Sequence, residues 1–433
     1  MLDLIEAKKR GRALSQNQIE GWIQGVVEES IPTYQTAALL MAIRLNGMTA
    51  EETGHLTMAM FQSGDKLEFK GFSKILDKHS TGGVGDKVTL ILAPLVAACG
   101  VPVAMLSGRG LGFSGGTIDK FEAIEGVNCS LSMEDMQRNL EQIGWTNSMP
   151  TRNLAPADRI IYALRDVTAT VDSLPLITAS IMSKKLAGGA SDLCLDVKCG
   201  QAAFMPDLEQ ARNLYHSLKE NGERCGLRVS GLISRMEEPL GFTVGNYLEV
   251  IESLAILQGQ MNSSLTELIM DLSRLMLQMA KPQLTDEMAR EQLQNALADG
   301  SAKDYFFKYL SACGARDGAL KKLETASFAS WPYQSVVAQH SGVVTAISGR
   351  SIAEAARDLG AGRHKTDDVI DPYAGVVLRV SLGDEVVAGQ ELAWVYGAKT
   401  NSTLRDQIRA SFSIDETRDP ASSLDSLVLQ YMD

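Results

Sequence analysis

Residues 78–120 constrain this chain most, because they hold two glycine-rich turns that carry hydroxyls and cations. The first turn reads Lys78-His-Ser-Thr-Gly-Gly-Val-Gly-Asp-Lys87, and the second reads Ser107-Gly-Arg-Gly-Leu-Gly-Phe-Ser-Gly-Gly-Thr-Ile-Asp-Lys120. Glycine tolerates positive φ and lets main-chain N–H groups point into one concavity, while Ser, Thr and Lys side chains add further donors for an oxyanion. The two turns therefore predict one anion held from two sides.

The stretch between the turns, residues 88–106, contains no charged residue and is long enough to cross a bilayer. Pro94, Gly100 and Pro102 argue against a membrane span, however, and Gly100 with Pro102 breaks the run. The pattern instead predicts a buried helix over residues 88–98 and a short strand over residues 101–106 of an α/β sheet. We expect no membrane segment here.

Composition narrows the class of protein further. A length of 433 residues allows two or three domains, and 45% apolar with 22% charged residues is typical of a soluble globular protein. The net charge of −12 disfavours nucleic acid as a partner. Six cysteines without a C-x-x-C pair indicate buried reduced thiols rather than zinc, and the first residues do not resemble a secretory signal. A cytoplasmic enzyme is the expectation.

Helical signals occur in two separated parts of the chain. Capping-box patterns begin at Ser15 and Thr49 within an all-helical stretch of residues 1–65. A second helical pattern covers residues 154–187 and puts Ser180 and Lys184 four apart, on one helix face. The expected fold class is α/β: a small all-helical lobe hinged to a large mixed α/β lobe, plus a C-terminal α+β unit.

The expected boundaries make the chain cross between the lobes several times. Alternating strand-like segments joined by Gly-Asp turns mark the C-terminal unit. The parts are residues 1–66 (helical lobe, first part), 67–156 (α/β lobe, first part, with the anion-binding turns), 157–190 (helical lobe, second part), 191–330 (α/β lobe, second part) and 331–433 (C-terminal α+β domain).

Two nucleotide-binding motifs fit the glycine turns poorly. Residues 110–115 match G-x-G-x-x-G, but no acidic residue follows at the distance that a dinucleotide site requires. Residues 82–87 do not have the P-loop spacing. Thr117 is expected to cap a helix whose free N–H groups face the anion.

Several long motifs, in one order, resemble the pyrimidine-nucleoside and thymidine phosphorylases. The similarity extends from the amino terminus to the segment Leu359-Gly-Ala-Gly-Arg363. It implies hinged lobes, a homodimer formed through the helical lobe, and phosphorolysis of a pyrimidine nucleoside in the cleft between the lobes. The motifs, besides the two turns above, are Ala155-Pro-Ala-Asp158, Arg165-Asp-Val-Thr-Ala-Thr-Val-Asp-Ser-Leu-Pro-Leu-Ile177 and Ala203-Phe-Met205.

The resemblance also implies three sets of site residues and no organic cofactor. Inorganic phosphate is the co-substrate, and a potassium ion is implied beside it. The phosphate residues are Lys78, Ser80, Thr89, Ser107 and Thr117. The pyrimidine residues are His79, Arg165, Ser180 and Lys184, of which His79, Arg165 and Lys184 are also implied as catalytic. The potassium positions are Gly85, Lys87, Leu240, Thr243 and Glu252, through backbone carbonyls and a carboxylate.

The residue types suit the implied chemistry. Breaking an N-glycosidic bond builds negative charge on the departing pyrimidine, so donors on the base stabilise the transition state. Arg165 and Lys184 would hold the O4/N3 edge, Ser180 would bond the ring and His79 would face O2. Phosphate, fixed below the sugar, would attack C1′ with inversion, and closing the lobes would exclude water.

Some positions depart from the family pattern and keep alternatives open. Met105 replaces a lysine frequent in uridine-accepting members, which favours thymidine slightly. A related phosphorylase or phosphoribosyltransferase of the same fold, or a catalytically weakened nucleoside-binding member, stays as the alternative. The other departures are Phe113 and Ser114 in the second turn, Met149-Pro150 near a hinge and Gln201-Ala202 in a glycine turn.

Overall fold

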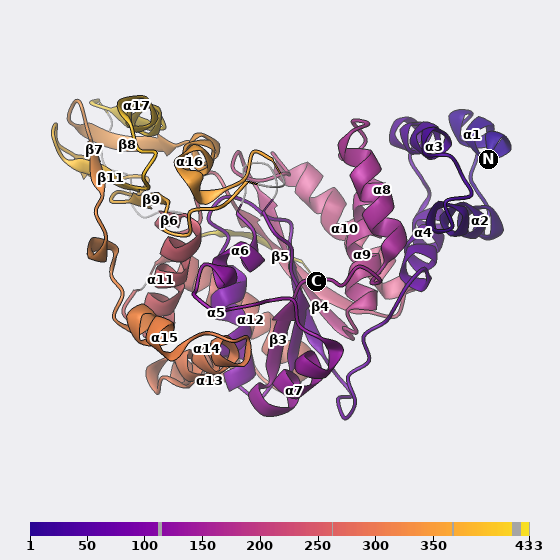
Figure 1. Ribbon diagram of the computed structural model, residues 1–433, viewed down its shortest axis with the longest axis horizontal. Helices are drawn as coiled ribbons and strands as arrows, with labels where there is room; N and C mark the ends of the chain where they lie inside the picture. The colour runs from indigo at the N-terminus through magenta and orange to yellow at the C-terminus, as the bar shows by residue number, and fades with distance from the viewer. Residues whose placement is uncertain (111–114, 262, 366–367, 418–425, 433) are drawn as a thin grey trace.

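The computed structural model describes residues 1–110, 115–261, 263–365, 368–417 and 426–432. Figure 1 shows three parts side by side: a helical lobe that contains the N-terminus, a central α/β lobe and a C-terminal unit at the opposite end. This arrangement confirms the expected fold class. Among the described residues, no helix is both long enough and apolar enough to cross a membrane.

The helical lobe is built from two separated pieces of chain. Both capping boxes are present, because Ser15 pairs with Gln18 and Thr49 pairs with Glu52 at their helix starts. Its core is apolar and includes Trp22. The helices are α1 (Leu2–Lys9), α2 (Gln16–Val27), α3 (Thr33–Asn46), α4 (Ala50–Gln62), α8 (Pro156–Asp166) and α9 (Leu174–Ala187).

The α/β lobe is organised on one twisted sheet of strand order β13-β5-β4-β1-β2-β3. All neighbouring pairs are parallel except β13 with β5. Parallel strands place their carboxyl ends at one edge, where α/β proteins bind ligands. The strands are β1 (Leu76–Ser80), β2 (Val103–Leu106), β3 (Trp145–Ser148), β4 (Asp192–Cys199), β5 (Arg228–Arg235) and β13 (Val428–Met432).

The uncharged stretch folds as a buried helix followed by a strand. Helix α5 (Val88–Ala98) has the predicted bounds and is buried from its first residue to Ala97. The strand begins at Val103 rather than at residue 101. Gly100 adopts a φ of 76° and Pro102 has no N–H for the ladder, so the strand starts only at Val103.

Further helices cover both faces of the sheet. Helices α11, α12 and α14 pack with α5, whereas α10 packs on β4 and β5 together with α9. The bounds are α6 (Thr117–Glu122), α7 (Met133–Ile143), α10 (Leu208–Arg224), α11 (Asn246–Leu257), α12 (Ser264–Ala280), α13 (Asp286–Ala298), α14 (Ser301–Ala312) and α15 (Asp317–Glu324).

The C-terminal unit is tied into the α/β lobe at two places. Strand β6 (Thr243–Val244), which belongs to the α/β lobe by sequence, pairs with β9, and β13 returns to the central sheet beside β5. The expected boundary at residue 331 is therefore crossed by strand pairing. The unit contains β7 (Gln334–Val337), β8 (Gly342–Ile347), α16 (Gly349–Ala356), η2 (Arg357–Ala361), β9 (Gly375–Leu378), β10 (Glu385–Val386), β11 (Glu391–Tyr396), α17 (Ser402–Ala410) and β12 (Phe412–Asp415), and η1 (Phe328–Ser330) precedes it.

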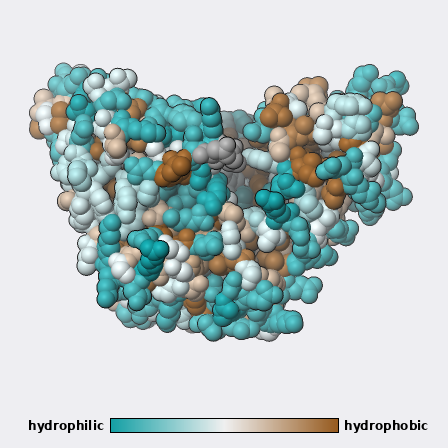
Figure 2. Space-filling model, in the orientation of Figure 1, coloured by the Kyte–Doolittle hydropathy of each residue, from teal (hydrophilic) through white to brown (hydrophobic). Residues whose placement is uncertain are grey.

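Three segments connect the lobes and lie against one another. Asp65 N donates to Asn153 O at 2.9 Å, and Leu67 N donates to Ala187 O at 2.8 Å. A Cβ atom on Gly64 would lie 2.0 Å from Asn153 O, so only glycine allows this close approach. Figure 2 shows the molecular face hollowed between the helical lobe and the C-terminal unit. Backbone hydrogen bonds thus hold the connecting segments together.

Candidate active site at the carboxyl end of strand β1

Strand β1 divides the candidate site into two halves, because successive side chains of a strand point to opposite faces. Lys78 shares one face with Asp196 of the neighbouring strand β4, and their charged atoms are 3.4 Å apart. Asp77 points to the other face, where Lys185 of α9 pairs with it at 2.9 Å. His79 shares that second face by alternation. One half therefore faces the glycine turns, and the other faces the helical lobe.

The first half contains a buried cluster of charges. Lys78 and Lys198 both approach Asp196, at 3.4 and 2.7 Å, and all three side chains are fully buried. Burial alone would lower the pKa of Lys78, but Asp86 and Asp196 raise it above its ordinary value. Burial would raise the pKa of Asp86, but Lys78 and Lys198 more than offset this and hold the carboxyl below its usual range. The Lys78 ammonium is charged and only loosely paired.

Hydroxyl and carboxylate side chains organise the first glycine turn. Ser80 Oγ donates to Asp86 Oδ2 at 2.5 Å and accepts from Gly82 N at 3.1 Å. Asp86 Oδ1 in turn accepts from Val88 N, the first residue of α5, at 3.2 Å. Thr89 lies in the first turn of that helix and is almost buried. The turn is thereby fixed between β1 and α5.

The second glycine turn begins where β2 ends. Ser107 N donates to Ser148 O at 3.0 Å, which extends the ladder with β3 by one residue. Asp119 Oδ2 accepts from Gly110 N at 2.7 Å and thereby holds the described part of the turn. Phe113 and Ser114, the expected departures from the family pattern, lie outside the described residues. Since β1 and β2 are parallel neighbours, both turns stand at the same sheet edge.

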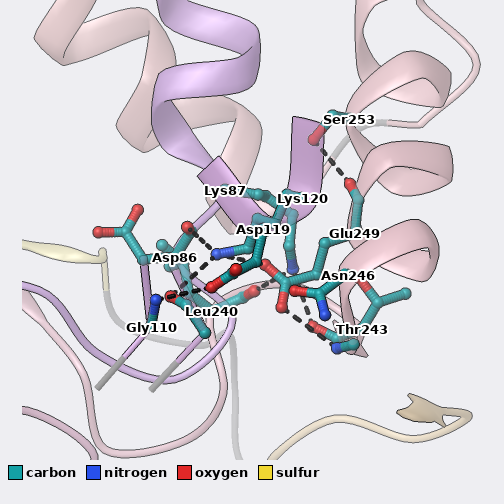
Figure 3. Close-up of polar contacts among 12 residues, drawn as sticks. Asp86, Lys87, Gly110, Asp119, Lys120, Leu240, Thr243, Asn246, Glu249 and Ser253 are labelled. Carbon is teal, nitrogen blue, oxygen red and sulfur yellow. Dashed lines mark hydrogen bonds and ion pairs between the residues drawn. The ribbon is translucent and has the colours of Figure 1, made fainter. Parts of the chain in front are cut away.

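Lys120 joins the two turns, and the sequence analysis did not single it out. Its Nζ donates to Asp86 O of the first turn at 2.9 Å and to Gly115 O of the second at 3.3 Å (Figure 3). Glu249 of α11 lies 3.3 Å from the same ammonium, which is almost fully buried. The sequence did contain one signal for Lys120. It follows Thr117 by three residues, a spacing that puts both side chains on the same face of a helix.

Thr117 does not cap α6, so that prediction was wrong. The helix begins at Thr117 itself, Gly116 occupies the N-cap position, and no side chain caps the helix end. A Cβ atom on Gly116 would lie 2.2 Å from Gly110 N, so the chain needs glycine at the cap. Thr117 is half-buried at the first helical position.

The second half of the site is formed by α8 and α9. Lys184 Nζ lies 2.9 Å from Ser180 Oγ and 2.5 Å from Asp158 Oδ2, which confirms that Ser180 and Lys184 share a helix face. Asp158 comes from the first turn of α8 and is buried. The Lys184 side chain keeps 34% of its exposure, so a ligand can reach an ammonium that the protein already orients.

Arg165 lies at the end of α8 and shapes the following loop. Its guanidinium donates to three carbonyl oxygens: Thr170 at 3.3 Å, Val171 at 2.6 Å and Leu176 at 3.1 Å. Within the part of the chain that the structure describes, these bonds use three of the five N–H groups and leave one on each terminal nitrogen. Arg165 is therefore fixed in position with two donors to spare.

His79 lies on the second face of β1, where the charges of Lys185 and Lys184 act on it. Its Nε2 atom is buried and has no hydrogen-bond partner in the described part of the chain. Burial, followed by the charges of Lys185, Lys78 and Lys184, lowers the pKa of His79 well below its ordinary value. The imidazole is therefore neutral near neutral pH and sits close enough to Lys184 to feel its charge.

This depressed pKa gives a pH prediction. Below about pH 6.5 an unfolded chain protonates its histidines, whereas folded His79 stays neutral, so the folded state loses stability as pH falls further. We expect one of the five histidine resonances to stay constant from about pH 8 to about pH 6 in NMR spectra, and to vanish in His79→Gln. A resonance that titrates normally and vanishes in His79→Gln would contradict this.

The residues matched to a potassium site do not fit a metal ion. Leu240 O, Thr243 O and Glu252 Oε2 converge at 2.6, 3.0 and 2.9 Å on the ammonium of Lys87. An ammonium donates hydrogen bonds and is no ligand for a cation. Across the residues that the structure describes, no group of three His, Cys, Asp or Glu side chains could hold a metal either.

Family models match all three parts of the chain. Residues 2–64 match the helical bundle domain of the glycosyl transferase family, and residues 73–303 match its α/β domain. Residues 343–415 match the pyrimidine nucleoside phosphorylase C-terminal domain. Anthranilate phosphoribosyltransferase from Thermus thermophilus has a similar fold, with a TM-score of 0.57 and 20% identity over 72% of this chain and 99% of that one. Fold and matched domains define a glycosyltransferase.

Similar proteins indicate which family of glycosyltransferases the chain belongs to. The chain is 44% identical to the pyrimidine-nucleoside phosphorylase of Staphylococcus haemolyticus over 402 residues, 93% of each chain. It is 43% identical to that of Geobacillus stearothermophilus over 402 residues, 92% of each chain. It is 42% identical to that of Bacillus subtilis over 402 residues, 93% of each chain. The chain belongs to the pyrimidine-nucleoside phosphorylase family.

Proposed function

We propose that this protein catalyses the reversible phosphorolysis of pyrimidine nucleosides to the free base and a pentose 1-phosphate. The observation that carries the proposal is the division made by β1. Lys78 and Ser80 lie at the glycine turns, whereas His79 lies on the opposite face near Lys184. A phosphate and a base held by these two groups would meet at a sugar placed between them.

The phosphate half of the site supplies charge and backbone donors. The cluster of Lys78 and Lys198 around Asp196 keeps an ammonium charged inside the protein. Both glycine turns start at the carboxyl ends of adjacent parallel strands, so their N–H groups can surround one anion. Ser80, Thr89, Ser107 and Thr117 are the proposed hydroxyl donors. Phosphate fixed there is pre-positioned to attack C1′.

The base half supplies donors for the leaving pyrimidine. Lys184 and the two spare N–H groups of Arg165 are proposed to bond the O4/N3 edge, and Ser180 is proposed to bond the ring. Neutral His79 would face O2 through its unpartnered Nε2. Negative charge grows on the base as the glycosidic bond breaks, so these contacts strengthen in the transition state.

We further propose that a homodimer forms through the helical lobe in the cytoplasm. Tyr34 and Leu45 of α3 are 71% and 74% exposed, and Met41 between them is 36% exposed. Their spacing places them along one side of the helix. We propose that this exposed apolar row forms the contact with the second subunit. Sedimentation velocity tests this, since a monomer at micromolar concentration would contradict it.

A slight preference for thymidine rests on Met105 alone. Met105 belongs to β2, and its side chain is buried in the core of the α/β lobe. We propose thymidine and deoxyuridine as better substrates than uridine, to be decided by the assay below.

The function is tested by release of base from thymidine, deoxyuridine, uridine and cytidine, each with and without phosphate. We expect free thymine or uracil and a sugar 1-phosphate only when phosphate is present. Base release without phosphate would contradict the proposal. A second arm offers AMP with phosphate, and pyrophosphorylated ribose with a free base. Turnover confined to that arm would favour a different glycosyl transfer, and tight nucleoside binding without turnover would indicate a weakened member.

A further inference from the structure

The place that the family resemblance assigns to a monovalent cation is filled by a side chain of this protein. Lys87 ends the first glycine turn, and its ammonium lies 2.6 Å from Leu240 O, 3.0 Å from Thr243 O and 2.9 Å from Glu252 Oε2. Lys87 and Glu252 side chains are both fully buried. We propose that the Lys87 ammonium replaces the metal cation and that this enzyme works without potassium.

The hydrogen-bond count at the site is complete. An ammonium has three donors, and the three oxygens use all of them. Glu252 Oε2 also accepts from Thr243 N at 3.0 Å and from Thr243 Oγ1 at 2.5 Å, and Oε1 accepts from Phe242 N at 2.8 Å. The oxygens that would have to bind an added ion are therefore already engaged.

Charge balance excludes a second cation from the same pocket. One ammonium meets one carboxylate, and neither is exposed to solvent. A potassium ion beside them would add an unpaired charge in a buried site, which is strongly unfavourable. Removing Lys87 is also unfavourable, because it leaves the negatively charged Glu252 carboxylate buried and without a cation.

The site connects the phosphate turn with two other elements. Leu240 N donates to Val84 O of the first turn at 2.9 Å, so that turn and segment 240–243 also touch through their backbones. Glu252 belongs to α11, and Thr243 begins β6, which pairs with β9 of the C-terminal unit. Figure 3 shows Lys87 next to Lys120, with Leu240 and Thr243 in the same group of side chains. Lys87 is thus a positioning residue that fixes the first turn against α11 and the C-terminal unit.

A tethered charge differs from a bound ion in one measurable way. An ion that binds only the folded protein raises its melting temperature with concentration, whereas a covalently attached ammonium gives no such dependence. We expect the wild-type melting temperature to be equal in choline and potassium chloride of matched ionic strength. We also expect the phosphorolysis rates to agree within about twofold when inorganic phosphate is supplied as its choline salt or as its potassium salt.

The decisive variant is Lys87→Ser, which removes the ammonium and opens space for an ion. With phosphate supplied as its choline salt, we expect a loss of activity of about 10- to 100-fold. This is the loss typical of removing a residue that orients the groups in contact with a ligand. Potassium should restore much of the activity and raise the melting temperature of this variant. Lys87→Met, which fills the space without charge, should stay impaired in both salts. Lys219→Ser on the surface of α10 is the matched control and should respond to neither salt.

Two results would overturn the inference. One is a wild-type rate or melting temperature that rises saturably with potassium but not with choline. The other is a folded Lys87→Ser protein whose activity and melting temperature ignore potassium. If Lys87→Ser fails to fold, the wild-type salt comparison and Lys87→Met decide. The rate measurements rest on the proposed phosphorolysis, but the melting measurements do not, so failure of one proposal is distinguishable from failure of the other.

Discussion

Replacing Lys184 by methionine is expected to lower kcat/KM for the pyrimidine nucleoside about 100- to 1,000-fold. This is the loss typical of removing one donor to a developing negative charge. Asp158 and Ser180 already orient the Lys184 ammonium, at 2.5 and 2.9 Å, so its removal takes away a pre-positioned cation. Steady-state kinetics of base release at saturating phosphate measure the effect.

The matched control for this variant separates catalysis from folding. Lys184→Met leaves the buried Asp158 carboxylate without its closest cation, which also lowers stability. The double variant Lys184→Met with Asp158→Asn removes the uncompensated charge. Its melting temperature should recover while its kcat/KM stays low. Recovery of activity together with stability would show that Lys184 acts only through folding, and would remove it from the proposed site.

Replacing Lys78 by methionine is expected to lower kcat/KM for phosphate by a similar factor, about 100- to 1,000-fold. The Lys78 ammonium stays charged inside the protein because Asp86 and Asp196 outweigh its burial. It approaches Asp196 only to 3.4 Å, so it keeps capacity to bond an anion. KM for the nucleoside should change much less, since the base half lies on the other face of β1.

Phosphate-dependent thermal stability gives an independent measure of the same site. A bound ligand raises the melting temperature of the folded protein as its concentration rises. Wild type should show this rise with phosphate, and Lys78→Met should not. The double variant Lys78→Met with Asp196→Asn restores charge balance without restoring an anion site, so it should also show no rise. An unchanged phosphate response in both variants would exclude Lys78 as a phosphate residue.

Local sequence patterns predicted the elements of this fold well. The uncharged run predicted the observed bounds of α5, because Gly100 and Pro102 follow directly after its end, whereas Pro94 is accommodated inside the helix. The capping boxes at Ser15 and Thr49 each join residues only three apart, so their signal is local. The placement of Ser180 and Lys184 on one face follows directly from helix geometry.

Contacts between distant parts of the chain were beyond local patterns. Lys87 and Glu252 are 165 residues apart, and only the family resemblance, which matched both to one potassium site, placed them together; no local pattern indicated an ion pair. The return of β13 pairs residues 428–432 with β5 at residues 228–235 through backbone hydrogen bonds, which carry little side-chain signature. The contacts of Lys120 with both turns depend on how the turns are placed in the folded protein, which no local pattern shows. Thr117 fitted the capping pattern, but the close approach of Gly110 to Gly116 decides that cap.

The most direct test of the two-sided site is a crystal structure with phosphate and a pyrimidine nucleoside analogue bound together. We predict phosphate at the glycine turns within hydrogen-bond distance of Lys78 and Ser107, and the pyrimidine ring on the opposite face of β1, in contact with Ser180 and Lys184. The sugar should lie between them with C1′ facing the phosphate. Phosphate and base on the same face of β1, or either one bound away from these residues, would contradict the account.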